Sequence, residues 1–134
     1  MLLKLLTKEE KQYFLDLMNF IVSMNSNNAQ VEIEVIKQFK SEMGDEINNY
    51  HKSSKKEDDV LKYFQGRPKV TRNIVYLNIL FCTLSDVMYS TEEHFFIEKV
   101  QEVFGISNRK KNELIKIVFA ERDIVEHARQ SVME

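Results

Sequence analysis

The chain has 134 residues, of which 43% are hydrophobic and 30% charged, and its formal net charge is −2 with a pI near 6.0. This length fits one domain that buries well over half of the surface of its unfolded chain. Nucleic-acid binding needs an excess of clustered Lys and Arg, so the weakly acidic balance excludes that class of partner. We expect a single domain over residues 1–134.

The apolar run 74–84 contains the only cysteine, Cys82. A single cysteine can form no intrachain disulfide, so nothing indicates an oxidising compartment. The run is also shorter than the roughly 20 residues that cross a bilayer. Residues 1–6 are apolar apart from Lys4, but they are too few for a secretory signal. We therefore expect a cytoplasmic protein without a transmembrane segment.

Apolar residues recur every three or four positions, and strand-like alternation is absent, which predicts an all-α fold. Two helix starts are marked by the spacing of a capping box, Thr7 with Glu10 and Ser90 with Glu93. In chain order we expect about seven helices, over 8–24, 29–43, 46–65 with a break near Ser53, 70–88, 91–104, 108–120 and 121–132.

The predicted helix 70–88 is apolar on nearly every side, which places it at the centre of a helical bundle. Residues 45–65 are mostly polar, and we interpret them as the connection between two helical halves at about 5–44 and 66–105. The C-terminal helices follow over 107–132. Neither half could bury its apolar face well alone, so the halves are expected to form one domain.

The two halves are related by a degenerate internal repeat with a shift of 61 residues, the separation of Gly44 from Gly105. Both glycines follow an apolar helix and suit the left-handed conformation that ends a helix. The same shift lays Glu32 on Glu93. An ancient duplication of a helix pair explains this register, and it predicts two pseudo-symmetric halves.

In the second half an apolar helix ends in Asp86, a turn with Glu93 follows, and the next apolar helix ends in Phe-Gly-Ile-Ser at 104–107. This pattern, with Glu seven positions after Asp, resembles the TerB-like family of tellurite-resistance proteins. The resemblance implies a small all-α domain of two repeated halves. It also implies a non-enzymatic, stress-linked protein that acts through protein–protein interactions. The chain departs from the family at Val87, where the family has Gly.

The resemblance further implies a divalent-metal site at Asp86 and Glu93, to which Glu32 would contribute from the first half. A hard cation such as Ca²⁺ takes about six to eight oxygen ligands. Asn25 stands where the first half would carry an Asp, so we expect any such site to be weak. The residues themselves favour a second interpretation, in which Glu93 closes a capping box with Ser90.

The sequence carries no motif that predicts enzyme chemistry. It lacks a Ser-His-Asp order, a G-x-S-x-G turn, a glycine-rich phosphate loop and a dinucleotide fingerprint. His94 and His127 each lie next to a Glu, whereas zinc ligands on a helix are three or four positions apart. We therefore expect no catalytic residues and no zinc site.

Two classes of function are left: a protein-interaction module and, as the alternative, a small-molecule or lipid-binding helical module. The last predicted helix carries an apolar stripe among charged residues, formed by Ile124, Val125, Ala128 and Val132. Such a stripe suits docking on the helix's own domain or on a partner helix, and a homodimer through an apolar helix face is also consistent with it. The Phe and Met stripes elsewhere favour core packing over a pocket.

Overall fold

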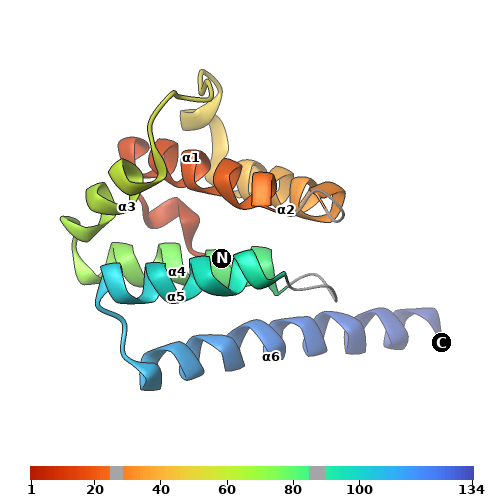
Figure 1. Ribbon diagram of the computed structural model, residues 1–134. Coiled ribbons are helices and arrows are strands. Elements are labelled where there is room, and N and C mark those ends of the chain that lie inside the picture. The colour runs from red at the N-terminus through yellow and green to blue at the C-terminus, as the bar shows by residue number, and fades with distance from the viewer. Residues whose placement is uncertain (25–28, 85–89) are drawn as a thin grey trace.

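The structure is a computed structural model that describes residues 1–24, 29–84 and 90–134; for Ala29, Val31 and Glu32 it describes the backbone alone. Within these ranges the chain forms six α-helices, and the expected all-α class is confirmed (Figure 1). The helices are α1 (Lys8–Met24), α2 (Ala29–Met43), α3 (Glu57–Gln65), α4 (Lys69–Thr83), α5 (Thr91–Phe104) and α6 (Asn108–Met133). Two short 3-10 helices, η1 (Leu3–Leu5) and η2 (Gly44–Ile47), precede α1 and follow α2.

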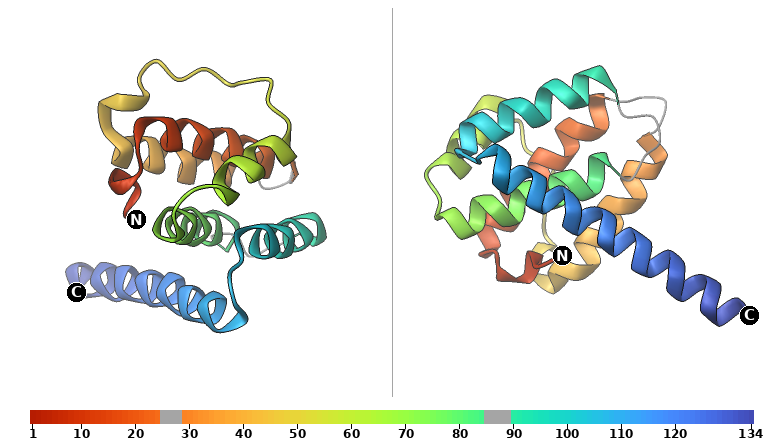
Figure 2. Two further views of the ribbon diagram at one scale, coloured as in Figure 1. Left: turned by 90° about the vertical axis from the view of Figure 1, so that its left-hand side faces the viewer. Right: turned by 90° about the horizontal axis from the view of Figure 1, so that it is seen from below.

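The helices are arranged in three layers (Figure 2). α1 and α2 pack side by side in the first layer, α4 and α5 form the second, and α6 covers the far side of α4. α3 lies at the edge of the molecule, where it contacts α1, α4 and α5. Among the described residues no helix is both long enough and apolar enough to span a membrane.

α4 lies at the centre of the bundle, as its apolar sequence predicts. It contacts all five of the other α-helices. Ten of its residues are buried, among them Tyr76, Ile79 and Leu80. Full burial of an aliphatic or aromatic side chain contributes about 1.5–3 kcal/mol, so the repeated burial along α4 is a main source of stability.

The helix ends follow the predicted caps. Thr7 and Glu10 form a complete capping box: the Glu10 amide donates to the Thr7 hydroxyl at 3.1 Å, and the Thr7 amide donates to the Glu10 carboxylate at 2.8 Å. Ser90 caps α5 by accepting from the Glu93 amide at 3.0 Å. Gly105, at φ 66°, closes α5, and its conformation is one that residues with a Cβ rarely adopt.

Two segments differ from the expected helices. Residues 108–120 and 121–132 form one continuous helix, α6, because neither Gly nor Pro interrupts them. In the expected helix 46–65 only the end is α-helical, as α3, and residues 51–56 are irregular. The polar segment before α3 has little apolar surface to bury, so packing does not stabilise a helix there. The end of the expected helix 70–88 lies outside the described residues.

Candidate functional site

The structure describes only one of the three expected metal ligands completely. Glu93 is 1% exposed, and its Oε1 accepts a hydrogen bond from the Ser90 hydroxyl at 3.1 Å. Asp86 and the side chain of Glu32 lie outside the described residues. Within the described part of the chain no group of three or more His, Cys, Asp or Glu residues is placed to hold a metal ion. The metal site therefore stays a prediction, while the expected cap of α5 by Ser90 is confirmed: its hydroxyl accepts from the Glu93 amide and contacts the Glu93 carboxylate.

Glu10, a buried carboxylate, links α1 to the turn before α4. Its Oε2 accepts from Arg67 at 2.8 Å and from the Thr71 hydroxyl at 3.1 Å. Burial alone would raise the pKa of Glu10, but the hydrogen bonds from Thr7, Arg67 and Thr71 outweigh it and lower the pKa below its ordinary value. An ionised carboxylate with this many donors is well suited to holding helices together and poorly suited to accepting a proton in catalysis.

Two further buried charges of α1 hold the segment that connects α2 to α3. Lys11 donates to the Met43 carbonyl at 3.3 Å, at the end of α2, and lies 3.3 Å from the Glu46 carboxylate. Asp16 accepts from the Tyr50 hydroxyl at 2.7 Å. The pKa of Tyr50 is raised by burial and then by this bond to Asp16. These contacts position the segment, and none of them leaves a nucleophile or base open to a substrate.

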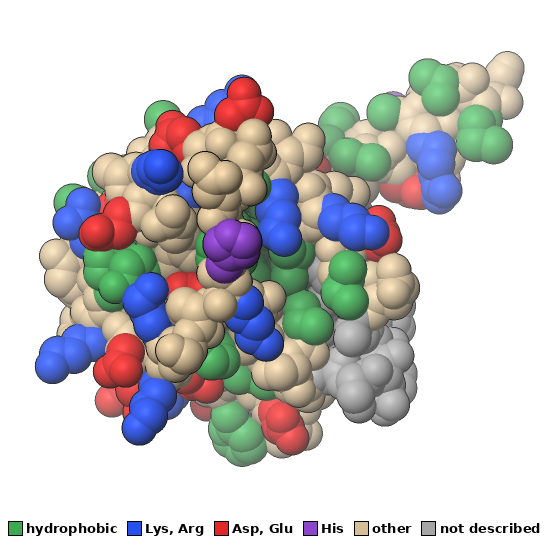
Figure 3. Space-filling view, turned by 90° about the horizontal axis from the view of Figure 1, so that it is seen from above, with side chains coloured by type: hydrophobic (Ala, Val, Ile, Leu, Met, Phe, Trp, Pro, Cys, Tyr) green, Lys and Arg blue, Asp and Glu red, His purple; other side chains and the backbone are tan. Residues whose placement is uncertain are grey.

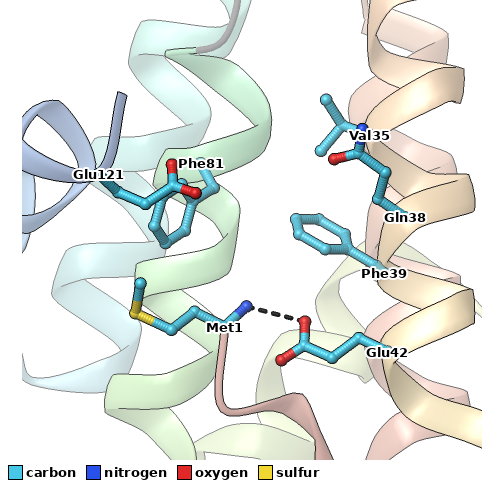
Figure 4. A pocket seen from close by; sticks show the side chains of 7 residues that line it. All are labelled: Met1, Val35, Gln38, Phe39, Glu42, Phe81 and Glu121. Carbon is cyan, nitrogen blue, oxygen red and sulfur yellow. Dashed lines mark hydrogen bonds and ion pairs between the residues drawn. The ribbon is translucent and has the colours of Figure 1, made fainter. Parts of the chain in front are cut away.

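A groove between α2 and α6 is the candidate functional site (Figure 4). One face of α2 forms one wall, since Val35, Gln38, Phe39 and Glu42 follow each other at helical spacing. Phe81 of α4 lines the opposite side. This part of the groove has a volume of about 450 Å³, within the usual range of about 300–1,000 Å³ for ligand sites.

The groove continues along α6. A second hollow of about 500 Å³ shares Gln38, Phe81 and Glu121 with the first, so the two are parts of one site. Val118 and Val125 of α6 add apolar surface to it. We call this combined site the α2–α6 groove; it has aromatic and aliphatic surface inside and polar side chains at its rim.

Acidic side chains dominate the rim of the α2–α6 groove. α6 contributes Glu121, Asp123 and Glu126. Arg122 also lines the groove, but its guanidinium donates to the Leu84 carbonyl at the end of α4 and lies over a neighbouring aromatic ring. The hydrogen bond and charge of Arg129 lower the pKa of Glu126, which keeps that carboxylate ionised.

One end of the groove holds the first residue of the chain. The Met1 ammonium donates to the Glu42 carboxylate and to the Asn78 amide oxygen, both at 2.9 Å (Figure 4). The Met1 side chain lines the groove beside them. This end of the groove thus holds an apolar side chain against apolar surface and binds a cation through the oxygens of Glu42 and Asn78.

α6 extends beyond the body of the molecule as an arm (Figures 2 and 3). Its early residues Leu114 and Val118 are buried, and Val125 and Val132 continue on the same face at intervals of seven residues. Val125 is 56% exposed and Val132 is 82% exposed. The face that packs on α4 therefore continues into a segment where, among the described residues, the apolar side chains are mostly exposed.

The apolar stripe of this arm is evident in the amino-acid sequence, whereas the groove is not. Val35 and Phe39 are part of an evident apolar stripe, and Phe81 is part of an apolar central helix, patterns that are typical of core residues. The space between them depends on how three helices pack, and no local pattern encodes it.

Comparison with known proteins gives no match: no family model matches the chain, and no curated protein sequence or solved structure matches it.

Proposed function

We propose that this protein is a non-enzymatic interaction module, and that the α2–α6 groove with the adjoining arm of α6 takes an apolar segment of another protein. The observation that carries the proposal is the apolar face of α6, which passes from the core at Leu114 and Val118 to the exposed Val125 and Val132, with the charged Glu121 and Arg122 between them. Exposed apolar surface with a polar rim is typical of protein–protein interaction sites.

A relation to the TerB-like family is part of this proposal, and the element bounds support it. α1 begins at Lys8 and α4 at Lys69, while α2 ends at Met43 and α5 at Phe104, so both pairs are 61 residues apart. Gly44 and Gly105 follow the two helix pairs with φ of 81° and 66°. We infer two helical halves that arose by duplication, and with them a stress-linked role of the tellurite-resistance kind.

A weak divalent-metal site at Asp86, Glu93 and Glu32 belongs to the same proposal. Glu93 fits such a site only in part, because it is buried and one carboxylate oxygen already accepts from Ser90. A carboxylate has capacity for further contacts, so capping and weak ion binding are compatible.

The alternative function is binding of a small molecule or lipid in the α2–α6 groove. Its volume and its aromatic lining by Phe39 and Phe81 favour this alternative. An apolar ligand would be held by those rings and oriented by Gln38 and Glu42.

Site-specific photo-crosslinking in cells that make the protein separates the two functions. A photo-crosslinking amino acid at Val125, which lines the groove, is expected to form a covalent adduct with a discrete protein. The same amino acid at Glu98, an exposed position on α5, serves as the matched control and is expected to form none. Absence of a Val125-specific protein adduct, with a lipid or metabolite co-purifying with the chain in native mass spectrometry, would support the alternative instead.

A further inference from the structure

We infer, on the basis of the proposed function, that the partner segment in the α2–α6 groove is a basic amphipathic helix, with apolar anchors inside the groove and Lys or Arg at its rim. Three features of the groove carry this inference: its walls, its charge and the way it holds Met1.

The walls of the groove favour a helical ligand. They are formed by α2, α4 and α6, whose backbone amides and carbonyls are mostly used within the helices themselves. An incoming chain therefore finds few backbone partners, and the described residues contain no strand edge for it to extend. A helix satisfies its own backbone groups, so it can enter an apolar groove without losing hydrogen bonds.

The rim of the groove favours a cationic ligand. In the described part of the chain neither Glu121 nor Asp123 has an ion-pair partner, and both border the groove. Arg122, the basic side chain among the α6 residues that line it, is directed to Leu84. Carboxylates along the rim attract a basic segment and repel an acidic one, which gives specificity as well as faster association.

The contacts of Met1 show that this combination of groups fits the groove. Its side chain occupies apolar surface near Phe39 and Phe81, and its ammonium is bound by Glu42 and Asn78 (Figure 4). A Lys placed next to a Leu on a partner helix would present the same two groups, an apolar side chain and an ammonium, further along the groove toward Glu121.

The test uses two synthetic amphipathic peptides that share one Leu face and differ only on the polar face, which carries Lys in one and Glu in the other. Binding to the full chain is measured by fluorescence anisotropy at low and at physiological salt. Backbone NMR shifts of the ¹⁵N-labelled chain locate the site. We expect the Lys peptide to bind at least about tenfold more tightly, to shift Gln38, Phe81 and Val125, and to weaken as salt rises.

A charge-reversal pair of variants tests the rim itself. E121K/D123K is expected to weaken the Lys peptide by about tenfold, because two attractive contacts become repulsive. E92K/E102K, which changes the same charges at exposed positions of α5, is the matched control and is expected to change affinity by less than about twofold. All four positions are on the surface, so the melting temperatures of both variants should stay close to that of the original chain.

The outcomes distinguish this inference from the function on which it rests. Equal binding of both peptides in the groove, or no effect of E121K/D123K, overturns the basic ligand but leaves an interaction groove in place. Failure of both peptides to shift the groove residues overturns the helical ligand and the proposed interaction groove together. If the chain sediments as a dimer and neither peptide changes the NMR shifts of the groove residues, the groove is assigned to a second copy of the chain. That result also overturns the inference.

Discussion

α1 and the end of α6 depart from the usual distribution of side chains in opposite directions. α1 buries three charged side chains, Glu10, Lys11 and Asp16, and each has a partner from another part of the chain. The end of α6 exposes the apolar side chains of Val125 and Val132. Charged side chains are seldom fully buried unless paired, and apolar surface that continues from a packed face is typical of an interaction site.

This difference separates the residues that stabilise the fold from those that we propose contact a partner. In these pairs the α1 side chain is buried and its charged partner is partly exposed. Removing the partner leaves a buried charge without compensation, and removing the buried side chain takes away its hydrogen bonds, so either change is destabilising. Removing an exposed apolar side chain takes away few contacts of the isolated chain, so it changes stability little. Changes in α1 should therefore affect stability, whereas changes in the arm of α6 should affect binding.

The largest effect is expected from Glu10→Ala. This change removes the reciprocal cap with Thr7 and leaves the buried Thr71 hydroxyl and the partly exposed Arg67 without their acceptor, so the free energy of unfolding should fall by about 2–3 kcal/mol. Urea denaturation followed by circular dichroism measures it. The matched control is Glu9→Ala at the next, exposed position, where a loss below about 1 kcal/mol is expected. Equal losses for the two variants would contradict the structural role assigned to Glu10.

Leu114→Ala and Val125→Ala compare the covered and the uncovered part of one face of α6. Leu114 is buried, so its truncation should cost about 2–3 kcal/mol in the free energy of unfolding. Val125 is exposed, and its truncation should change that free energy by less than about 0.5 kcal/mol while weakening peptide binding. A comparable loss at both positions in the same denaturation experiment would show that the arm of α6 is covered within the isolated chain.

A smaller effect is expected from acid. The pKa of Glu10 is lower in the folded chain than its ordinary value of 4.5, so the unfolded chain binds a proton more readily. The stability that Glu10 contributes is complete above that ordinary value and is lost as the pH falls through the folded pKa. Thermal melts between pH 7 and pH 3 should show a smaller acid-induced decrease for Glu10→Gln than for the original chain. A steeper decrease for the variant would contradict the lowered pKa.

Local signals explain which helices the sequence predicts well. The start of α1 at Lys8 and the ends of α5 at Thr91 and Phe104 agree with the predicted bounds, because a hydroxyl cap or a left-handed glycine acts on residues a few positions away. The irregular residues 51–56 could not be predicted this way. The segment that contains them is held by Asp16 through Tyr50 and Lys55, which lie 34 and 39 residues further along the chain.

Non-local packing also explains why the candidate site is only partly predictable. The stripe that includes Val125 and Val132 is evident in the sequence, but its periodicity is the same whether a face is covered or exposed. Phe81 has the sequence signature of a core residue, yet it is only half-buried and lines the α2–α6 groove. Its exposure depends on the separation of α2 from α6, which is set by contacts among helices distant in the chain.

The smallest effect concerns the two capping boxes and the predicted metal site. Glu10 and Glu93 both follow a capping hydroxyl by three residues, but only Glu93 belongs to the predicted ligand set with Asp86 and Glu32. A weak site with a dissociation constant of about 1 mM would raise stability by about 0.4 kcal/mol at 1 mM ion, which corresponds to about 1–2 °C in melting temperature. We expect a rise of this size with Ca²⁺, Mg²⁺ or Mn²⁺, and its loss in Asp86→Asn.

Glu10→Gln, which changes the other capping carboxylate, is the control. It should melt at a lower temperature but show the same rise in melting temperature when the ion is added. If no ion shifts the melt of the original chain and Asp86→Asn changes nothing, Glu93 serves only as a cap, and the two boxes differ solely in the partners that surround them.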